Sequence, residues 1–179
     1  MTRRDQRKRK EIRSAVRESK PDVLTKLVID LYELSAENRT FVETRLALTG
    51  DPLAPYKERI DEALYPDAFS RKPIRVAEAR RAVAAYNKAA GDHDGLLELM
   101  IYYVERGTAC TVDYGDIDEQ FYSSLESMYD RFLNALETTG PEAKSSYRHR
   151  AQAVVDQARG IGWGFYDYLA DRFAQAFPG

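Results

Sequence analysis

Large apolar residues recur every three or four positions along most of this chain, and no segment alternates apolar and polar residues convincingly. The clearest repeat starts within residues 113–132, and its members are Ile117, Phe121, Leu125, Met128, Phe132 and Leu136. Such spacing places side chains on one face of an α-helix, whereas strands alternate with period two. The pattern therefore predicts an all-α protein.

Two acidic residues predict where this helix begins. Asp116 precedes the apolar run, and Glu119 follows three positions later. An N-cap side chain with an acidic residue at the third helical position is the spacing of a capping box. We expect the helix to begin after Asp116 and to end before Gly140, with residues 107–115 as a connector in front of it.

Proline and glycine divide the rest of the chain into segments of helical length. After Lys20 and Pro21 comes an apolar stripe formed by Leu24, Leu27, Val28, Leu31 and Leu34. Ser35 is the expected N-cap of the next helix, whose inner face is assigned to Phe41, Val42, Leu46 and Leu48. Residues 65–73 are expected to form a surface loop. We predict seven to nine helices in one domain, arranged as a bundle or as α-solenoid-like pairs.

Length and composition narrow the class of protein. A chain of 179 residues suits one domain, and its 44% hydrophobic and 31% charged residues are typical of soluble globular proteins. No apolar run approaches the roughly 20 residues that span a membrane, and the N-terminus lacks the apolar region of a secretory signal. Cys110 is the only cysteine, so no internal disulfide forms. We expect a cytoplasmic protein.

Charge separates the N-terminus from the remainder. Residues 1–20 hold nine Lys or Arg and three Asp or Glu, a net charge of +6; because the whole chain carries −2, the other 159 residues carry −8. We expect residues 1–18 to be a basic arm or a frayed helix, and residues 19–179 to be the helical domain. Nucleic-acid association through the arm would use Arg3, Arg4, Arg7, Lys8, Arg9 and Lys10. A solvated terminus is the alternative.

Four carboxylates lie within seven residues, and they are Asp113, Asp116, Asp118 and Glu119. Clustered oxygens bind Mg²⁺ or Ca²⁺, so these residues are a candidate divalent-metal site. The glycine and the terminal glutamate of a calcium loop are missing at the required spacing. The alternative is structural, because acids in the first turn of a helix cap it and favour its dipole.

Aromatic residues accumulate in the second half of the chain and suggest a surface for a ligand or a partner. The candidate residues are Tyr114, Asp116, Asp118, Glu119, Tyr122, Trp163 and Tyr166. Tyrosines that pack in the core are the alternative. The glycines around Trp163 do not form a phosphate loop, since no strand precedes them and no lysine is near. We expect a helix cap at Gly160 and close backbone approach at Gly162 and Gly164.

No catalytic constellation is recognised. His93 and His149 have no second His or Cys at zinc-ligand spacing. Catalysis by Cys110 with a histidine base has no supporting motif. No catalytic residue and no cofactor is therefore assigned.

Three phrases resemble a bacterial family of helical domains of unknown function. They are the segment from Tyr114 to Met128, the segment from Gly160 to Phe165, and Leu97 to Glu105. The resemblance extends from about Val23 to about Phe173, and it implies a helical fold without an established activity.

The expected function is that of a non-enzymatic protein-interaction module with a protein partner. One alternative is a small-molecule or divalent-metal site in the acidic and aromatic region near Tyr114. The other alternative is nucleic-acid association through the basic arm.

Overall fold

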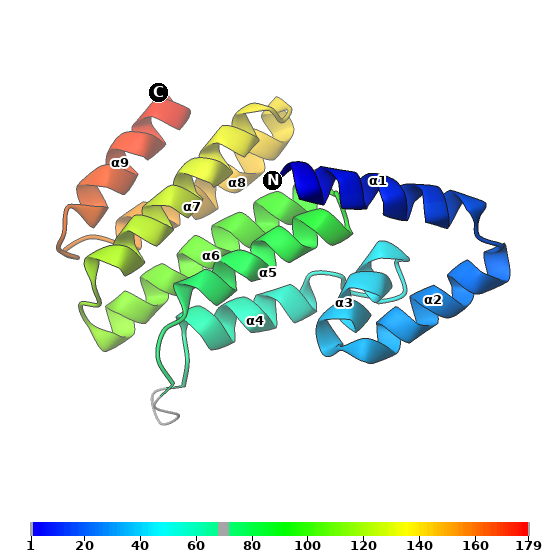
Figure 1. Ribbon diagram of the computed structural model, residues 1–179. Coiled ribbons are helices and arrows are strands. Elements are labelled where there is room, and N and C mark those ends of the chain that lie inside the picture. Colours follow the sequence, from blue (N-terminus) through cyan, green and yellow to red (C-terminus); the bar gives the residue numbers. More distant parts are fainter. Residues whose placement is uncertain (1, 68–71, 179) are drawn as a thin grey trace. The chain divides into compact units, whose positions relative to one another are not determined.

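The computed structural model describes residues 2–67 and 72–178 (Figure 1). These residues form nine α-helices and no strand, which confirms the predicted all-α class and the number of helices. Contacts group the chain into an N-terminal unit, Met1–Thr49, and a C-terminal unit, Gly50–Gly179. The predicted division at residue 18 stays a prediction. Part of the predicted loop at 65–73, residues 68–71, lies outside the described residues.

The N-terminal unit contains three helices, namely α1 (Arg3–Glu18), α2 (Pro21–Leu34) and α3 (Ala36–Arg45). A capping box starts α1, because Thr2 Oγ1 accepts from the amide of Asp5 at 3.2 Å and the Asp5 carboxylate accepts from the amide of Thr2 at 3.0 Å. The basic segment is thus helical from its first turn. Pro21 occupies the first position of α2, where its fixed φ suits a helix start.

Polar contacts join α2 to α3. Ser35 caps α3 as predicted, with its hydroxyl accepting from the amide of Asn38 at 3.1 Å. The Asn38 side chain donates to the carbonyl of Leu31 at 2.8 Å, and the Tyr32 hydroxyl donates to Glu43 at 2.9 Å. Thr44 is the one buried residue between positions 2 and 49. This unit is therefore held by helix caps and hydrogen bonds rather than by an apolar core.

The C-terminal unit contains six helices, namely α4 (Ala54–Leu64), α5 (Val76–Ala89), α6 (His93–Tyr114), α7 (Glu119–Glu137), α8 (Pro141–Gln157) and α9 (Phe165–Ala176). The longest helix, α6, packs against α4, α5, α7 and α8. Its buried side chains include Leu97, Met100, Tyr103 and Val104. An amphipathic helix normally hides one stripe, so contact with four neighbours explains why apolar residues occur around much of α6.

The predicted connector at 107–115 is wrong, because α6 continues to Tyr114. Gly107 lies buried inside the helix, and a Cβ atom there would approach Leu125 Cδ2 of α7 to 2.2 Å. This glycine marks a close helix contact rather than a break. The helix ends instead at Gly115, whose φ of 86° is easily adopted only by glycine.

The predicted start of α7 is also wrong by two residues. The N-cap is Asp118, whose Oδ1 atom accepts from the amide of Phe121 at 2.7 Å. Glu119 is the first helical residue rather than the third, and Asp116 lies outside the helix. The apolar face is confirmed, since every predicted member from Phe121 to Leu136 is buried and Ile117 is half-buried.

A partly buried ion network links α4, α6 and α8. Lys57 of α4 binds Glu98 of α6 at 2.7 Å. Arg150 of α8 binds both Glu98 and Glu105 of α6, the latter at 2.7 Å. Burial raises the pKa of Glu98, but hydrogen bonds from Arg150 and Lys57 outweigh it and leave the pKa below its ordinary value of 4.5.

We expect Phe121→Ala and Phe132→Ala each to lower the free energy of unfolding by about 3–5 kcal/mol, because each removes a fully buried ring and leaves a cavity. Urea denaturation followed by circular dichroism measures the change. Val112→Ala, at a side chain that is 54% exposed, is the control and should change it by less than about 0.5 kcal/mol. Equal effects in all three variants would contradict the assigned core.

The Glu98 network predicts how stability depends on pH. A carboxyl whose folded pKa lies below its unfolded pKa stabilises the fold above the unfolded value and loses this contribution as the pH falls through the folded value. We therefore expect the unfolding midpoint in urea to fall on acidification below the ordinary pKa of 4.5. Glu98→Gln should flatten that fall, and an unchanged pH profile would show that the network does not contribute.

Candidate functional site

Asp116 joins two turns that are distant in the sequence. One carboxylate oxygen accepts from the hydroxyl of Tyr122 at 2.7 Å, and the other accepts from the indole nitrogen of Trp163 at 2.9 Å. The Tyr122 hydroxyl also lies 2.6 Å from Thr111 Oγ1. The structure thus brings together three of the predicted surface residues, Asp116, Tyr122 and Trp163, at the α6–α7 and α8–α9 turns.

Unusual backbone conformations position Trp163. It has a φ of 63°, which is uncommon for a residue with a side chain, and Gly164 follows with a φ of 72° as the N-cap of α9. The indole hydrogen bond to Asp116 offsets part of this strain. Close backbone approach at Gly162 and Gly164 is not observed, because nothing lies within 4 Å of a Cβ at Gly164 and only Asp116 Oδ2, at 3.9 Å, is near Gly162.

Gly160 is likewise not the helix cap that the sequence suggested. Helix α8 ends at Gln157, and Ala158 is its C-cap. Gly160 lies in the turn that follows, with a φ of 84°. The positive φ angles of Gly160 and Gly164 show that these glycines allow the backbone to turn.

The remaining predicted residues other than Glu119, which is the first residue of α7, have other partners. The hydroxyl of Tyr65 donates to Asp113, which raises the pKa of Tyr65, and the Tyr65 ring packs 5.3 Å from that of Tyr114. Asp118 caps α7, while the Arg159 guanidinium lies 5.8 Å from the ring of Tyr166. Sequence reasoning missed Tyr65, because it lies 48 positions from Asp113 and no local pattern connects them.

The structure does not gather the four carboxylates of the predicted metal site into one group. Within residues 2–67 and 72–178, no group of three or more His, Cys, Asp or Glu side chains is arranged to hold a metal ion. The physical reason is that a helix end and a turn separate the four carboxylates. The Asp113 carboxylate accepts a hydrogen bond from the Tyr65 hydroxyl. The Asp116 carboxylate accepts from Tyr122 and Trp163, and the Asp118 carboxylate caps α7.

A shallow hollow lies beside Asp116, and its charged side chains are already engaged in hydrogen bonds or ion pairs. It is lined by Thr111, Val112, Gly115, Asp116, Gln157, Arg159, Gly160, Ile161 and Gly162. Both Asp116 oxygens already accept hydrogen bonds, and Arg159 is paired with Asp156 at 3.1 Å. Cys110 is buried nearby in α6, where burial raises the pKa of its thiol to about 11. A protonated, buried thiol is a poor nucleophile.

The most extensive unusual surface lies on the N-terminal unit. Ten large apolar side chains are exposed between Ile12 and Leu48, whereas three are exposed among the described residues of the C-terminal unit. The predicted inner face of α3 is partly wrong, since Leu46 and Leu48 are 57% and 67% exposed. Such an accumulation is typical of a binding surface.

We name four side chains the open face of α2, and they are Val23, Leu27, Leu31 and Leu34. At 3.6 residues per turn they lie within about 80° of one another around the helix. Their exposed fractions are 57%, 45%, 44% and 74%. The side of α2 near α3 is different, because Val28, Ile29 and Tyr32 share a shallow groove there with residues of α3 and the segment after it.

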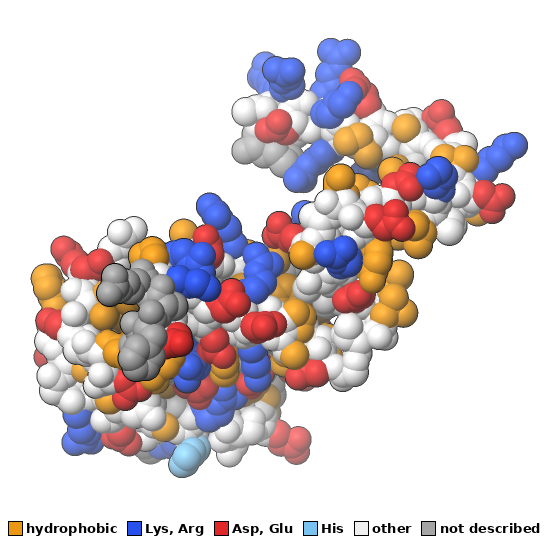
Figure 2. Space-filling model, turned by 90° about the horizontal axis from the view of Figure 1, so that it is seen from below, with side chains coloured by type: hydrophobic (Ala, Val, Ile, Leu, Met, Phe, Trp, Pro, Cys, Tyr) orange, Lys and Arg blue, Asp and Glu red, His pale blue; other side chains and the backbone are white. Residues whose placement is uncertain are grey.

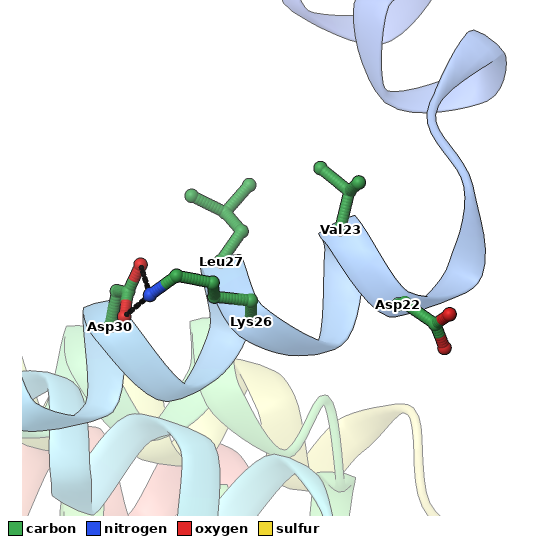
Figure 3. A pocket seen from close by; sticks show the side chains of 5 residues that line it. All are labelled: Asp22, Val23, Lys26, Leu27 and Asp30. Atoms are coloured by element: carbon green, nitrogen blue, oxygen red, sulfur yellow. Dashed lines mark hydrogen bonds and ion pairs between the residues drawn. The ribbon is translucent and has the colours of Figure 1, made fainter.

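Figure 3 shows part of the open face from close by. Val23 and Leu27 extend from the same side of α2, and Lys26 lies beside them in an ion pair with Asp30 at 2.9 Å. An apolar ridge with a charged border is the arrangement of many helix contact surfaces.

Helix α1 separates its charges by side. Six cations lie on an arc of about 160° that contains no carboxylate, as follows from 3.6 residues per turn. We name this set the basic arc, and its members are Arg3, Arg7, Arg9, Lys10, Arg13 and Arg17. Arg4 and Lys8 of the predicted set lie outside the arc, and Arg13 and Arg17, which are not in the predicted set, lie within it. Figure 2 shows Lys and Arg side chains projecting from this unit.

The chain matches no protein-family model, and no curated protein and no solved structure matches it. The resemblance to a bacterial helical family therefore stays a prediction. None of the helices in the described part of the chain is both long and apolar enough to cross a membrane.

The contact between Asp116 and Trp163 can be tested with the fluorescence of the only tryptophan. We expect Asp116→Ala to release the indole, which is already 59% exposed, so that its fluorescence anisotropy falls as the ring gains mobility. Asp113→Ala is the matched control, because its partner is Tyr65 and the anisotropy should not change. Equal anisotropy for Asp116→Ala and the native chain would contradict the contact.

Proposed function

We propose that this protein is a cytoplasmic, non-enzymatic protein-interaction module that associates with a second copy of itself through the open face of α2. The observation that carries the proposal is the N-terminal unit, which exposes ten large apolar side chains and buries Thr44 alone among residues 2–49. Apolar surface of this kind is stabilised when another apolar surface covers it.

A second copy is the proposed partner because the apolar residues of the open face can pack against the same residues of another α2. Two copies of α2 that run antiparallel about a two-fold axis near Ile29 place Leu27 of one copy opposite Leu31 of the other. Leu34 then lies opposite Val23. An isologous contact of this kind uses one surface twice and closes after two subunits.

Charge at the border of the open face favours the antiparallel arrangement. In the antiparallel pair, Lys26 of one copy lies near Glu33 of the other. In a parallel pair, Lys26 of one copy would face the opposite border of the other copy, so its contact with Glu33 would be lost. Opposite charges across the border therefore favour the antiparallel pair.

The expected affinity is modest. Full burial of one aliphatic side chain contributes about 1.5–3 kcal/mol, and the open face has roughly half of each side chain left to bury. Eight such side chains across two copies contribute about 6–12 kcal/mol. Because association costs at least about 4 kcal/mol, at most about 8 kcal/mol remains, so we expect a dissociation constant in the micromolar range or weaker.

We expect sedimentation velocity of the full chain at about 10–200 µM to show a species of twice the 20.5 kDa monomer mass that grows with concentration. Leu27→Gln/Leu31→Gln should abolish it, because these substitutions remove apolar area from the centre of the open face. The matched control is Ile29→Gln/Leu46→Gln, which changes two equally exposed aliphatic residues outside the open face and should leave the dimer intact.

Two results would overturn this proposal. The native chain would remain monomeric over the whole concentration range, or both double variants would weaken the dimer equally. Circular dichroism of each variant confirms that helix content is retained, so that a loss of the dimer is not confused with unfolding.

The region near Asp116 is less favoured as a binding site. Its carboxylate and indole satisfy each other, and no free catalytic group lines the adjoining hollow in the described residues. The proposal therefore rests on the N-terminal unit, and we further propose that the chain belongs to the bacterial helical family that its three phrases resemble.

A further inference from the structure

We propose that α1 binds the phosphate backbone of duplex DNA through the basic arc, without reading base sequence. This inference does not depend on self-association through α2, because the two surfaces share no residue.

The basic arc is available for a ligand. All described residues of α1 are exposed, and Arg3, Lys10, Arg13 and Arg17 make no hydrogen bond or ion pair within residues 2–67 and 72–178. By contrast, Arg7 forms an ion pair with Glu11 at 3.1 Å. Lys8, which lies outside the basic arc, forms an ion pair with the same Glu11 at 3.4 Å. A row of unpaired cations stabilises a nearby polyanion more than paired cations would.

The helix holds these cations at fixed positions. The capping box of Thr2 and Asp5 secures the first turn, so the row begins at Arg3 and continues to Arg17. At 1.5 Å per residue, these fourteen steps span about 21 Å. B-form DNA carries one negative charge per about 1.7 Å of its axis, so several phosphates lie within reach of the arc.

The shape of α1 favours B-form DNA over other nucleic acids. A helix with its side chains is about 10–12 Å across, and the major groove of B-form DNA is about 12 Å wide. The major groove of duplex RNA is deep and narrow and excludes side chains. Single strands are usually held by stacked aromatic rings, and the first aromatic residue of the chain is Tyr32.

An anionic membrane is a less suitable ligand for α1. Helices that lie on membranes insert a broad apolar face, often with Trp or Phe. The side of α1 that faces away from the basic arc has only Ile12, Ala15 and Val16 as apolar residues, with Asp5 and Lys8 between them. So small an apolar area gives little insertion energy.

The acidic charge elsewhere limits the affinity. Since residues 1–20 carry +6 and the whole chain −2, most of the remaining surface repels phosphate. We therefore expect weak binding with a Kd of about 10⁻⁴–10⁻⁶ M, which is the range of non-specific DNA binding at physiological salt.

The experiment measures anisotropy of a labelled duplex DNA with the full-length protein at several salt concentrations. The native chain should bind two duplexes of unrelated sequence equally. For B-form DNA, the slope of log K against log salt is about −0.9 per phosphate contact, so Lys10→Gln/Arg13→Gln should reduce its magnitude by about two.

The matched control is Arg4→Gln/Lys8→Gln. It removes the same two charges from the same helix, but from positions outside the basic arc. Glutamine has nearly the helix propensity of lysine and arginine, so both variants should remain helical by circular dichroism. The control should keep the slope of the native chain within about half a unit, since neither side chain contacts phosphate.

Four results would overturn the inference. The native chain would fail to bind duplex DNA at low salt, or both double variants would lose binding equally, which would indicate a net-charge effect without a defined surface. Tighter binding of single-stranded DNA or duplex RNA would contradict the groove argument. Retention by vesicles of anionic lipid without binding of duplex DNA would assign α1 to membranes instead.

Discussion

The close packing of α6 against its neighbours is the interaction on which the C-terminal unit depends. Gly107 lets Leu125 of α7 approach the α6 backbone, while Tyr103, Val104 and their neighbours fill the remaining sides. Interiors packed to the density of crystals leave little freedom for the position of each helix. The ends of α6 and α7 are consequently held in place, and with them the turn that contains Asp116.

Asp116 and its two hydrogen-bond partners connect the α6–α7 turn to the α8–α9 turn. Its hydrogen bonds with Tyr122 and Trp163 satisfy a carboxylate at the end of the helix pair and support the left-handed turn before α9. Hydrogen bonds to a charged group contribute about 1.5–3 kcal/mol, enough to offset an unfavourable backbone conformation. These contacts turn Asp116 toward the α8–α9 turn and away from Asp113, which meets Tyr65 instead.

The N-terminal unit depends on local helix signals more than on a packed core. Its helices are defined by local signals, such as the Thr2 capping box, Pro21 at the first turn of α2 and the Ser35 cap. Its apolar side chains are largely exposed, and the cations of α1 gather on one side of the helix. Helices of this length owe most of their stability in proteins to packing, and within this unit much of the apolar side of α2 stays uncovered.

The sequence alone determined the helical class, the apolar face of α7 and the cap at Ser35, because these depend on residues three or four positions apart. Only the tertiary structure decided that Gly107 lies within a helix and that Asp118, not Asp116, caps α7. It also decided that Asp113 meets Tyr65 and that Leu46 and Leu48 are exposed rather than part of an inner face. Apart from the Asp118 cap, whose hydrogen bond to Phe121 spans three positions, these outcomes depend on contacts between distant residues, and local spacing carries no information about them.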